Sequence, residues 1–295
     1  MKVKILIPLY LLFIVLFTSC GKGDDDLRGG PGTTGNTESI MTDVAYGSDP
    51  KQKMDIYLPA NRTTATTKVL IYIHGGAWAG GDKADINGAP LDTIRKRFPD
   101  YAFFNLNYRL AAFPATNAFP AQELDVKAAV EYIYSRRAEY LVTDKFVMMG
   151  GSAGGHLALL HAYKYPSPVK IKAVVDFFGP TDMVDMYNNP GSYPAASIAL
   201  LMSGTPTSNP TLYQQSSPLT FATAAAACPT IILQGGLDPL VNATRQSEAL
   251  KIKLTTAGVV NQYVFYPTQV HGPWDVATNT DALNKIQPFL AVNVP

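Results

Sequence analysis

The sequence predicts an α/β fold in which a mostly parallel central sheet carries helices on both faces. Short, nearly continuous apolar runs alternate with segments of helical periodicity, as expected of parallel strands that are buried on both faces. Two strand-like segments precede the first strong apolar run and indicate an antiparallel edge. In chain order, the expected strands are residues 39–46, 54–58, 69–73, 101–106, 146–149, 171–178, 230–233 and 263–266.

Three helices are expected between these strands. The first begins at Pro120, a residue favoured in the first helical turn, and its apolar residues then recur on one helix face up to 133. The second covers 153–165, directly after a strand. The third runs over 243–256 and stops before Gly258, a common residue at helix C-termini.

Residues 181–228 interrupt the alternation. They are rich in Asn, Pro, Gly, Ser and Thr and contain one short apolar segment at 196–202. Insertions of this length are usually functional or locally folded, so we expect a small cap near the functional site. No second linker follows, and residues 39–295 are therefore predicted to form one domain that includes this insertion.

The N-terminal segment has the layout of an export signal. Two lysines precede an apolar run at 5–17, which is shorter than the roughly 20 residues of a membrane span. The run ends in Phe-Thr-Ser-Cys20 and is similar to a bacterial lipoprotein signal. We expect a signal peptide at 1–19, a lipidated Cys20, a flexible Gly- and Asp-rich tether at 20–38, and export to the outer membrane or cell surface. An ordinary cleaved signal and an uncleaved anchor are the alternatives.

The overall charge argues against nucleic acid as a partner. The 295 residues carry a net charge of +1, with a pI near 7.7 and 16% charged residues. The charges are well mixed along the chain, so there is no basic stripe of the kind that binds phosphate backbones. If Cys20 is lipidated, Cys228 has no partner for a disulfide, and a buried thiol is its expected state.

A nucleophile is predicted at Ser152. The pattern Gly-x-Ser-x-Gly over 150–154 lies between the expected strand at 146–149 and the expected helix at 153–165. A serine on a tight strand-to-helix turn is held in an exposed position, and small neighbours leave room for the turn. The alternative is a glycine-rich turn in which the serine has no chemical role.

Serine needs a base, which is usually a histidine that a carboxylate orients. His271 lies in a loop after the last expected strand, whereas His156 and His161 lie on the helix after the serine. Asp238 follows the strand at 230–233 and so lies at the carboxyl edge of the sheet, where α/β sites assemble. We therefore assign His271 as the base and Asp238 as its partner. The alternative acids between the serine and the histidine are Asp176, Asp182, Asp185 and Glu248.

A second loop is suited to bind an oxyanion. The strand at 69–73 leads into His-Gly-Gly-Ala-Trp at 74–78. We expect the backbone N–H groups of Gly76, Ala77 and Ala153 to stabilise negative charge on a reacting oxygen. His74 is interpreted as a structural residue of this loop. The two tryptophans, Trp78 and Trp274, adjoin the two loops and either pack them or stack on a bound sugar or aromatic group.

These motifs together resemble one family over most of residues 40–275. The matching stretches include HGGAW, Asn107-Tyr-Arg-Leu, FPAQELDVKAAVEYI, GGSAGGHLALL, SPLTFA, GGLDPLV and VHG. The chain resembles the α/β-hydrolase carboxylesterases of the hormone-sensitive-lipase type, especially bacterial carbohydrate esterases that act on acetyl xylan or feruloyl esters.

The resemblance implies a serine ester hydrolase that acts through an acyl-enzyme on small-molecule or carbohydrate esters, with no metal or organic cofactor. Similar His-Gly-Gly-aromatic loops occur in kynurenine formamidases. An amidase or a peptidase on the same fold therefore stays open, as does a non-catalytic binding lipoprotein.

Overall fold

The computed structural model describes residue 35 and residues 37–112 and 116–295. The predicted signal peptide at 1–19, Cys20 and nearly all of the tether at 20–38 lie outside the described residues. Within the described part of the chain, no helix is long and apolar enough to cross a membrane.

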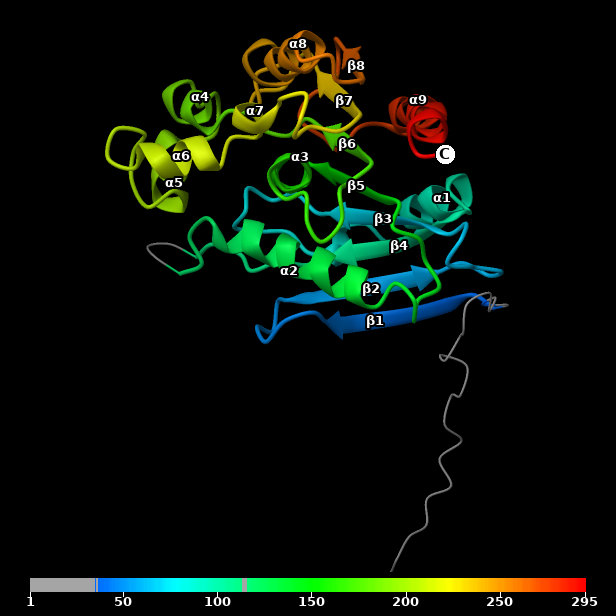
Figure 1. Ribbon diagram of the computed structural model, residues 1–295. Helices are drawn as coiled ribbons and strands as arrows, with labels where there is room; N and C mark the ends of the chain where they lie inside the picture. The colour runs from blue at the N-terminus through cyan, green and yellow to red at the C-terminus, as the bar shows by residue number, and fades with distance from the viewer. Residues whose placement is uncertain (1–34, 36, 113–115) are drawn as a thin grey trace, which may run out of the picture.

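An eight-stranded sheet forms the centre of the molecule (Figure 1), in the order β1-β2-β4-β3-β5-β6-β7-β8. β1 pairs antiparallel with β2, β2 pairs antiparallel with β4, and all later neighbours are parallel. Every strand that the sequence predicts is present, and the antiparallel edge is confirmed. The strands are β1 Ser39–Ala45, β2 Lys53–Leu58, β3 Lys68–Ile73, β4 Tyr101–Leu106, β5 Phe146–Gly151, β6 Ala173–Phe177, β7 Thr230–Gly235 and β8 Asn261–Tyr266.

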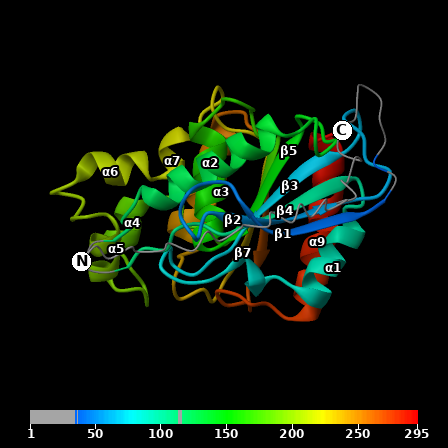
Figure 2. The same ribbon diagram turned by 90° about the horizontal axis from the view of Figure 1, so that it is seen from below.

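Helices cover both faces of the sheet, as predicted (Figures 1 and 2). One face packs on α2 (Ala121–Ser135), α3 (Ala153–Lys164) and α8 (Ala249–Thr256). The opposite face packs on α1 (Gly88–Arg97) and α9 (Val276–Asn293). The pattern at 120–133 and the one at 153–165 are confirmed as helices.

Two helices lack a clear signal in the sequence. Only Leu91 and Ile94 are buried along α1, and α9 contains Pro288 in its interior. The side-chain carboxylate of Asp275 caps α9 by accepting a hydrogen bond from the Thr278 N–H at 2.8 Å. Few residues of either helix are buried, so neither helix contains a long apolar run that stands out in the sequence.

The helix predicted at 243–256 begins differently from the expectation. Its first turn is a π-helix, η3 (Thr244–Glu248), which precedes α8. The Glu248 N–H donates to the Ala243 carbonyl at 2.8 Å, five residues back. Such wide turns are rare and are found often at functional sites.

The insertion at 181–228 is locally folded. It contains the short helices α4 (Met183–Asn188), α5 (Ala195–Leu201), α6 (Pro210–Gln215) and α7 (Pro218–Phe221), which lie on the α3 side of the sheet in Figure 1. Their apolar side chains join the core on that face, including Met183, Ile198, Leu201 and Tyr213. The role of this insertion as a cap stays a prediction. Cys228, its last residue, is a buried free thiol whose pKa is raised by burial to about 12.

Candidate active site

The turn between β5 and α3 holds Ser152 in a strained conformation. Its φ of 55° and ψ of −124° lie in a region that residues with a side chain rarely adopt. The turn is also tightly packed, because a Cβ on Gly154 would lie 2.0 Å from the Ile73 carbonyl oxygen. Only glycine fits at that position, and the same holds for Gly150, where a Cβ would lie 2.4 Å from the Gly154 carbonyl carbon.

The three predicted residues Ser152, His271 and Asp238 meet at the carboxyl edge of the sheet. The Oγ of Ser152 lies 2.8 Å from Nε2 of His271, and Nδ1 of His271 lies 2.8 Å from Oδ2 of Asp238. The Asp238 side chain is fully buried and that of His271 is 13% exposed. Since Asp238 is an acceptor, Nδ1 carries the proton, and Nε2 is free to accept from the serine hydroxyl.

Asp238 is fixed by the turn that follows β7. Its Oδ1 accepts hydrogen bonds from the N–H groups of Leu240 and Val241, each at 2.8 Å. Its Oδ2 accepts from Nε2 of Gln234 at 3.1 Å, in addition to the bond from His271. Four donors therefore surround a carboxylate that has no contact with water, and they compensate for the solvation it has lost.

The oxyanion loop lies against the serine turn. A Cβ on Gly75 would lie 2.9 Å from the Gly151 carbonyl oxygen and 3.3 Å from the Ser152 Cβ. Gly76 and Ala77 have φ angles of 109° and 53°, which turn the backbone sharply at this point. The predicted donors, the N–H groups of Gly76, Ala77 and Ala153, have no hydrogen-bond partner among the described residues.

Tyr108 and His74 shape this loop from behind. The Tyr108 hydroxyl donates to the carbonyls of His74 and Gly75, at 3.1 and 3.3 Å. The His74 ring stacks on the Tyr108 ring at 4.3 Å, and burial lowers the pKa of His74. His74 is thus neutral and packed, as the structural interpretation expects.

His156 and His161 are buried on α3 and do not contact Ser152 through their side chains. The Trp78 Nε1–H donates to His156 Nδ1 at 3.1 Å, and His156 Nε2 lies 2.7 Å from the Ser216 carbonyl oxygen. Burial lowers the pKa of His156 to about 4 and that of His161 to about 3. His156 is therefore neutral with its proton on Nε2, and it links the oxyanion loop to the insertion.

The two tryptophans pack the loops and do not present a free ring to a ligand. Trp78 is 2% exposed and Trp274 is 7% exposed. The Trp274 Nε1–H donates to the Val270 carbonyl at 2.8 Å, one residue before His271. Their burial agrees with a role in packing the loops, and stacking of either ring on a bound sugar stays a prediction.

An aromatic residue that the sequence analysis did not single out, Phe178, lies directly beside the histidine. Its ring centroid is 4.7 Å from that of His271. A Cβ on Gly272 would lie 2.8 Å from the Phe178 ring, and one on Gly151 would lie 3.5 Å from it. With a φ of 45°, Phe178 also has a backbone conformation that is unusual for a bulky residue. No local motif marks this position.

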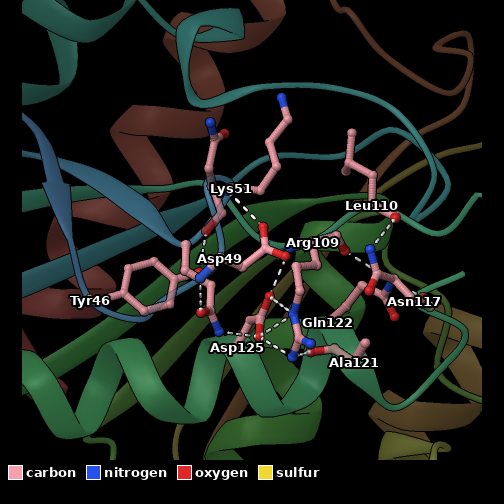
Figure 3. Close-up of polar contacts among 11 residues, drawn as sticks. Tyr46, Asp49, Lys51, Arg109, Leu110, Asn117, Ala121, Gln122 and Asp125 are labelled. Carbon is pink, nitrogen blue, oxygen red and sulfur yellow. Dashed lines mark hydrogen bonds and ion pairs between the residues drawn. The ribbon is translucent and has the colours of Figure 1, made fainter.

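A partly buried ion pair anchors the chain that follows β4 (Figure 3). Nη2 of Arg109 lies 2.6 Å from Oδ1 of Asp125, whose side chain is fully buried on α2. The Gln122 amide donates to the carbonyls of Arg109 and Asn117, at 3.0 and 2.8 Å. Further along, the Ala111 N–H donates to the Trp78 carbonyl at 2.8 Å. This network ties the oxyanion loop to α2.

In the described residues, no three His, Cys, Asp or Glu side chains are grouped so as to hold a metal ion.

Comparison with known proteins identifies the family of the chain and the class of its fold. The BD-FAE family model matches residues 54–254. Esterase LipQ of Mycobacterium tuberculosis is 25% identical over 84% of this chain, and Esterase LipC of the same organism is 29% identical over 48%. The chain spans 60% and 37% of the length of these two relatives.

Among solved structures, a truncated carbohydrate esterase from gut microbiota superposes with a TM-score of 0.73 and 27% identity. That match covers 90% of this chain and 99% of the other. A bifunctional GH43-CE protein of Bacteroides eggerthii gives a TM-score of 0.74 and 28% identity, over 87% of this chain and 35% of its own. The chain belongs to the BD-FAE family, and its fold is that of the α/β-hydrolase esterases.

Proposed function

We propose that this protein is a carboxylic-ester hydrolase in which Ser152 is the nucleophile, His271 the general base and Asp238 the residue that orients the base. The observation that carries the proposal is the chain of two 2.8 Å contacts from the serine hydroxyl through the imidazole to a buried carboxylate. A serine with an aligned base and a third group that orients it is the arrangement that activates a hydroxyl for acyl transfer.

The reaction proceeds in two halves. In the first, Nε2 of His271 takes the proton of Ser152 as Oγ attacks the ester carbonyl, and the carbonyl π electrons move onto oxygen. The tetrahedral intermediate then collapses, the C–O bond to the alcohol breaks, and His271 returns the proton to the departing alcohol oxygen. In the second half, His271 takes a proton from water as the water oxygen attacks the acyl carbonyl. The second tetrahedral intermediate then collapses, its bond to Ser152 Oγ breaks, and His271 returns the proton to Oγ as the acid leaves.

Negative charge on the tetrahedral intermediate is stabilised by the backbone. The N–H groups of Gly76, Ala77 and Ala153 are free to donate, and Ala153 begins α3, whose N-terminus favours negative charge. A single donor in such a site contributes about 2.7–4 kcal/mol to stabilising the transition state.

For the substrate, we propose carbohydrate esters or small acyl esters. The support is the similarity to the carbohydrate esterase from gut microbiota and to the bifunctional GH43-CE protein. An amide substrate is the second candidate, because a kynurenine formamidase of Aspergillus versicolor is 32% identical over 41% of this chain.

A substrate panel with purified protein tests both candidates. The panel contains p-nitrophenyl acetate, acetylated xylan, methyl ferulate, an N-formyl arylamine and a short peptide. We expect turnover of the esters and loss of that turnover in Ser152→Ala. Ser135→Ala is the matched control, because this serine is exposed at the end of α2 and its hydroxyl bonds only to the Tyr132 carbonyl.

Each outcome of the panel has a definite meaning. Hydrolysis by Ser152→Ala at the wild-type rate would remove the nucleophile assignment. Faster turnover of the formyl amide than of every ester would replace the esterase by the amidase. Binding of acetylated xylan without hydrolysis of any substrate would favour a non-catalytic binding protein.

We further propose that Cys20 is lipidated and anchors the protein to a bacterial outer membrane or cell surface. The support is the lysine-flanked apolar run that ends in Phe-Thr-Ser-Cys20. Several acyl chains at one residue anchor a protein stably, unlike a single chain. Incorporation of radiolabelled palmitate that is lost in Cys20→Ser is the expected result, and a secreted, unlabelled product would contradict it.

A further inference from the structure

A line of buried polar side chains continues behind Asp238. Gln234, on β7, has no exposed surface. Its Nε2 donates to Asp238 Oδ2 at 3.1 Å and to the Gly235 carbonyl at 3.0 Å. Its Oε1 accepts from the hydroxyl of Ser247, also fully buried, at 2.7 Å. The Gln234 amide is therefore held at both ends, and its donor end is directed at the carboxylate oxygen that holds His271.

Ser247 belongs to the π-helical turn η3, and this turn is fixed on its other side. Oε1 of its neighbour Gln246 accepts from the N–H groups of Thr181 and Asp182, at 2.7 and 2.8 Å. Two consecutive side chains of the turn therefore make different buried contacts: Gln246 holds the start of the insertion, and Ser247 holds Gln234. A wide turn changes where successive side chains point, which is one reason such turns occur at functional sites.

We propose that Gln234, oriented by Ser247, is a positioning residue for the reaction proposed above. It fixes Asp238 Oδ2 in line with His271 Nδ1, and it shares the carboxylate charge. The proposal rests on the assignment of Ser152, His271 and Asp238 as the reacting set. It extends this set by two side chains that do not touch the substrate.

Removing the Gln234 donor should change the interaction between Asp238 and His271. With one donor fewer, the negative charge of Asp238 acts more fully on His271 and stabilises the imidazolium form. The neutral base is then available only at higher pH. The acidic limb of the kcat/KM profile should therefore move to higher pH, and kcat should fall because the carboxylate is less well fixed.

The other titratable groups in the surroundings make no hydrogen bond to Gln234 or Ser247 in the described part of the chain. Asp275, on the loop that carries His271, binds Gln269 and Thr278. Asp185 and Arg245 pair with each other at 3.1 Å beside η3. All three are unchanged in the variants below, so their contributions are common to every profile.

The test uses Gln234→Met and Ser247→Ala, with p-nitrophenyl acetate turnover followed over pH. For Gln234→Met we expect kcat lower by about tenfold, since one hydrogen bond to a charged group is lost, with little change in KM. The acidic limb should move upward by about half a pH unit. Ser247→Ala should give a smaller shift of the same sign, and it removes so little volume that it serves if Gln234→Met does not fold.

Two controls separate this role from a merely structural one. Gln122→Met removes another fully buried amide, bonded to two carbonyls, and Ser217→Ala removes a buried hydroxyl that donates to the Tyr213 carbonyl at 2.8 Å. Both should alter thermal stability without moving the acidic limb. In the double variant, Ser247→Ala should add no further shift, because it acts only through Gln234.

The outcomes distinguish this proposal from the one on which it rests. If Gln234→Met or Ser247→Ala lowers the Tm but leaves the acidic limb of the kcat/KM profile in place, the positioning role is overturned. Additive shifts in the double variant would overturn the relay through Ser247. If Ser152→Ala retains turnover, the proposed function itself fails, whatever the Gln234 variants do.

Discussion

Replacing His156 by phenylalanine removes two buried hydrogen bonds and puts a slightly larger, apolar ring in the same place. The Trp78 indole N–H and the Ser216 carbonyl lose their contacts with the ring, which are 3.1 and 2.7 Å long. Trp78 is 2% exposed and Ser216 is 1% exposed, so water cannot easily replace the lost partner. Each orphaned group costs about 1–3 kcal/mol, and the variant should lose about 4 kcal/mol of unfolding free energy near pH 7.

The pH dependence provides a second signature. The folded-state pKa of His156 is lowered by burial to about 4, against 6.5 for the free side chain. The unfolded chain therefore binds a proton at this site between pH 6.5 and 4 while the folded chain does not, so acidification through this window removes stability from the wild type. The variant has no such site, and the difference in stability between the two should shrink by roughly 3 kcal/mol as the pH falls to 4.

His161→Phe is the matched control on the same helix. His161 is buried too, but neither of its ring nitrogens has a partner among the described residues. Its replacement should cost little or even stabilise the protein at pH 7. Urea unfolding at pH 7 and pH 4.5 measures both variants. A His156→Phe variant as stable as His161→Phe, or a gap to wild type that does not narrow on acidification, would refute the reasoning.

Three further substitutions address the packing around the site. Gly154→Ala puts a Cβ 2.0 Å from the Ile73 carbonyl oxygen, so α3 must move. We expect the free energy of unfolding to fall by about 1–3 kcal/mol and a fluorophosphonate to label Ser152 more slowly. Labelling at the wild-type rate would contradict this. Asp125→Ala removes the buried partner of Arg109 and should lower the free energy of unfolding by about 2 kcal/mol or more. Truncating the exposed Glu131, which pairs with Lys127, should change it by less than about 0.5 kcal/mol. Equal effects of the two substitutions would count against a stabilising role for the Arg109–Asp125 pair. Phe178→Ala should reduce kcat by about tenfold through loss of support for His271, and an unchanged kcat would show that the ring contact is dispensable.

Local sequence patterns were sufficient for the strands and for the serine turn. Strand positions follow from apolar runs, and the Gly-x-Ser-x-Gly turn follows from the side chains that it can tolerate. A few consecutive residues are therefore enough to predict either feature. The helices α1 and α9 were not predicted, because only a narrow part of each faces the core. The π-helical start of the segment before α8 was not predicted either, since no residue type requires it.

The sequence by itself determined the candidates for the proposed reaction: Ser152 in its glycine-rich turn, and Asp238 and His271 each after a strand. The tertiary structure alone decided how they meet, because the serine and the histidine are 119 residues apart and are brought together only by the order of β5, β6, β7 and β8 in the sheet. It also decided that Phe178, Gln234 and Ser247 lie beside them, and that both tryptophans are buried. These contacts join segments that are distant in the chain. No local sequence pattern around any of these side chains predicts which residue it contacts.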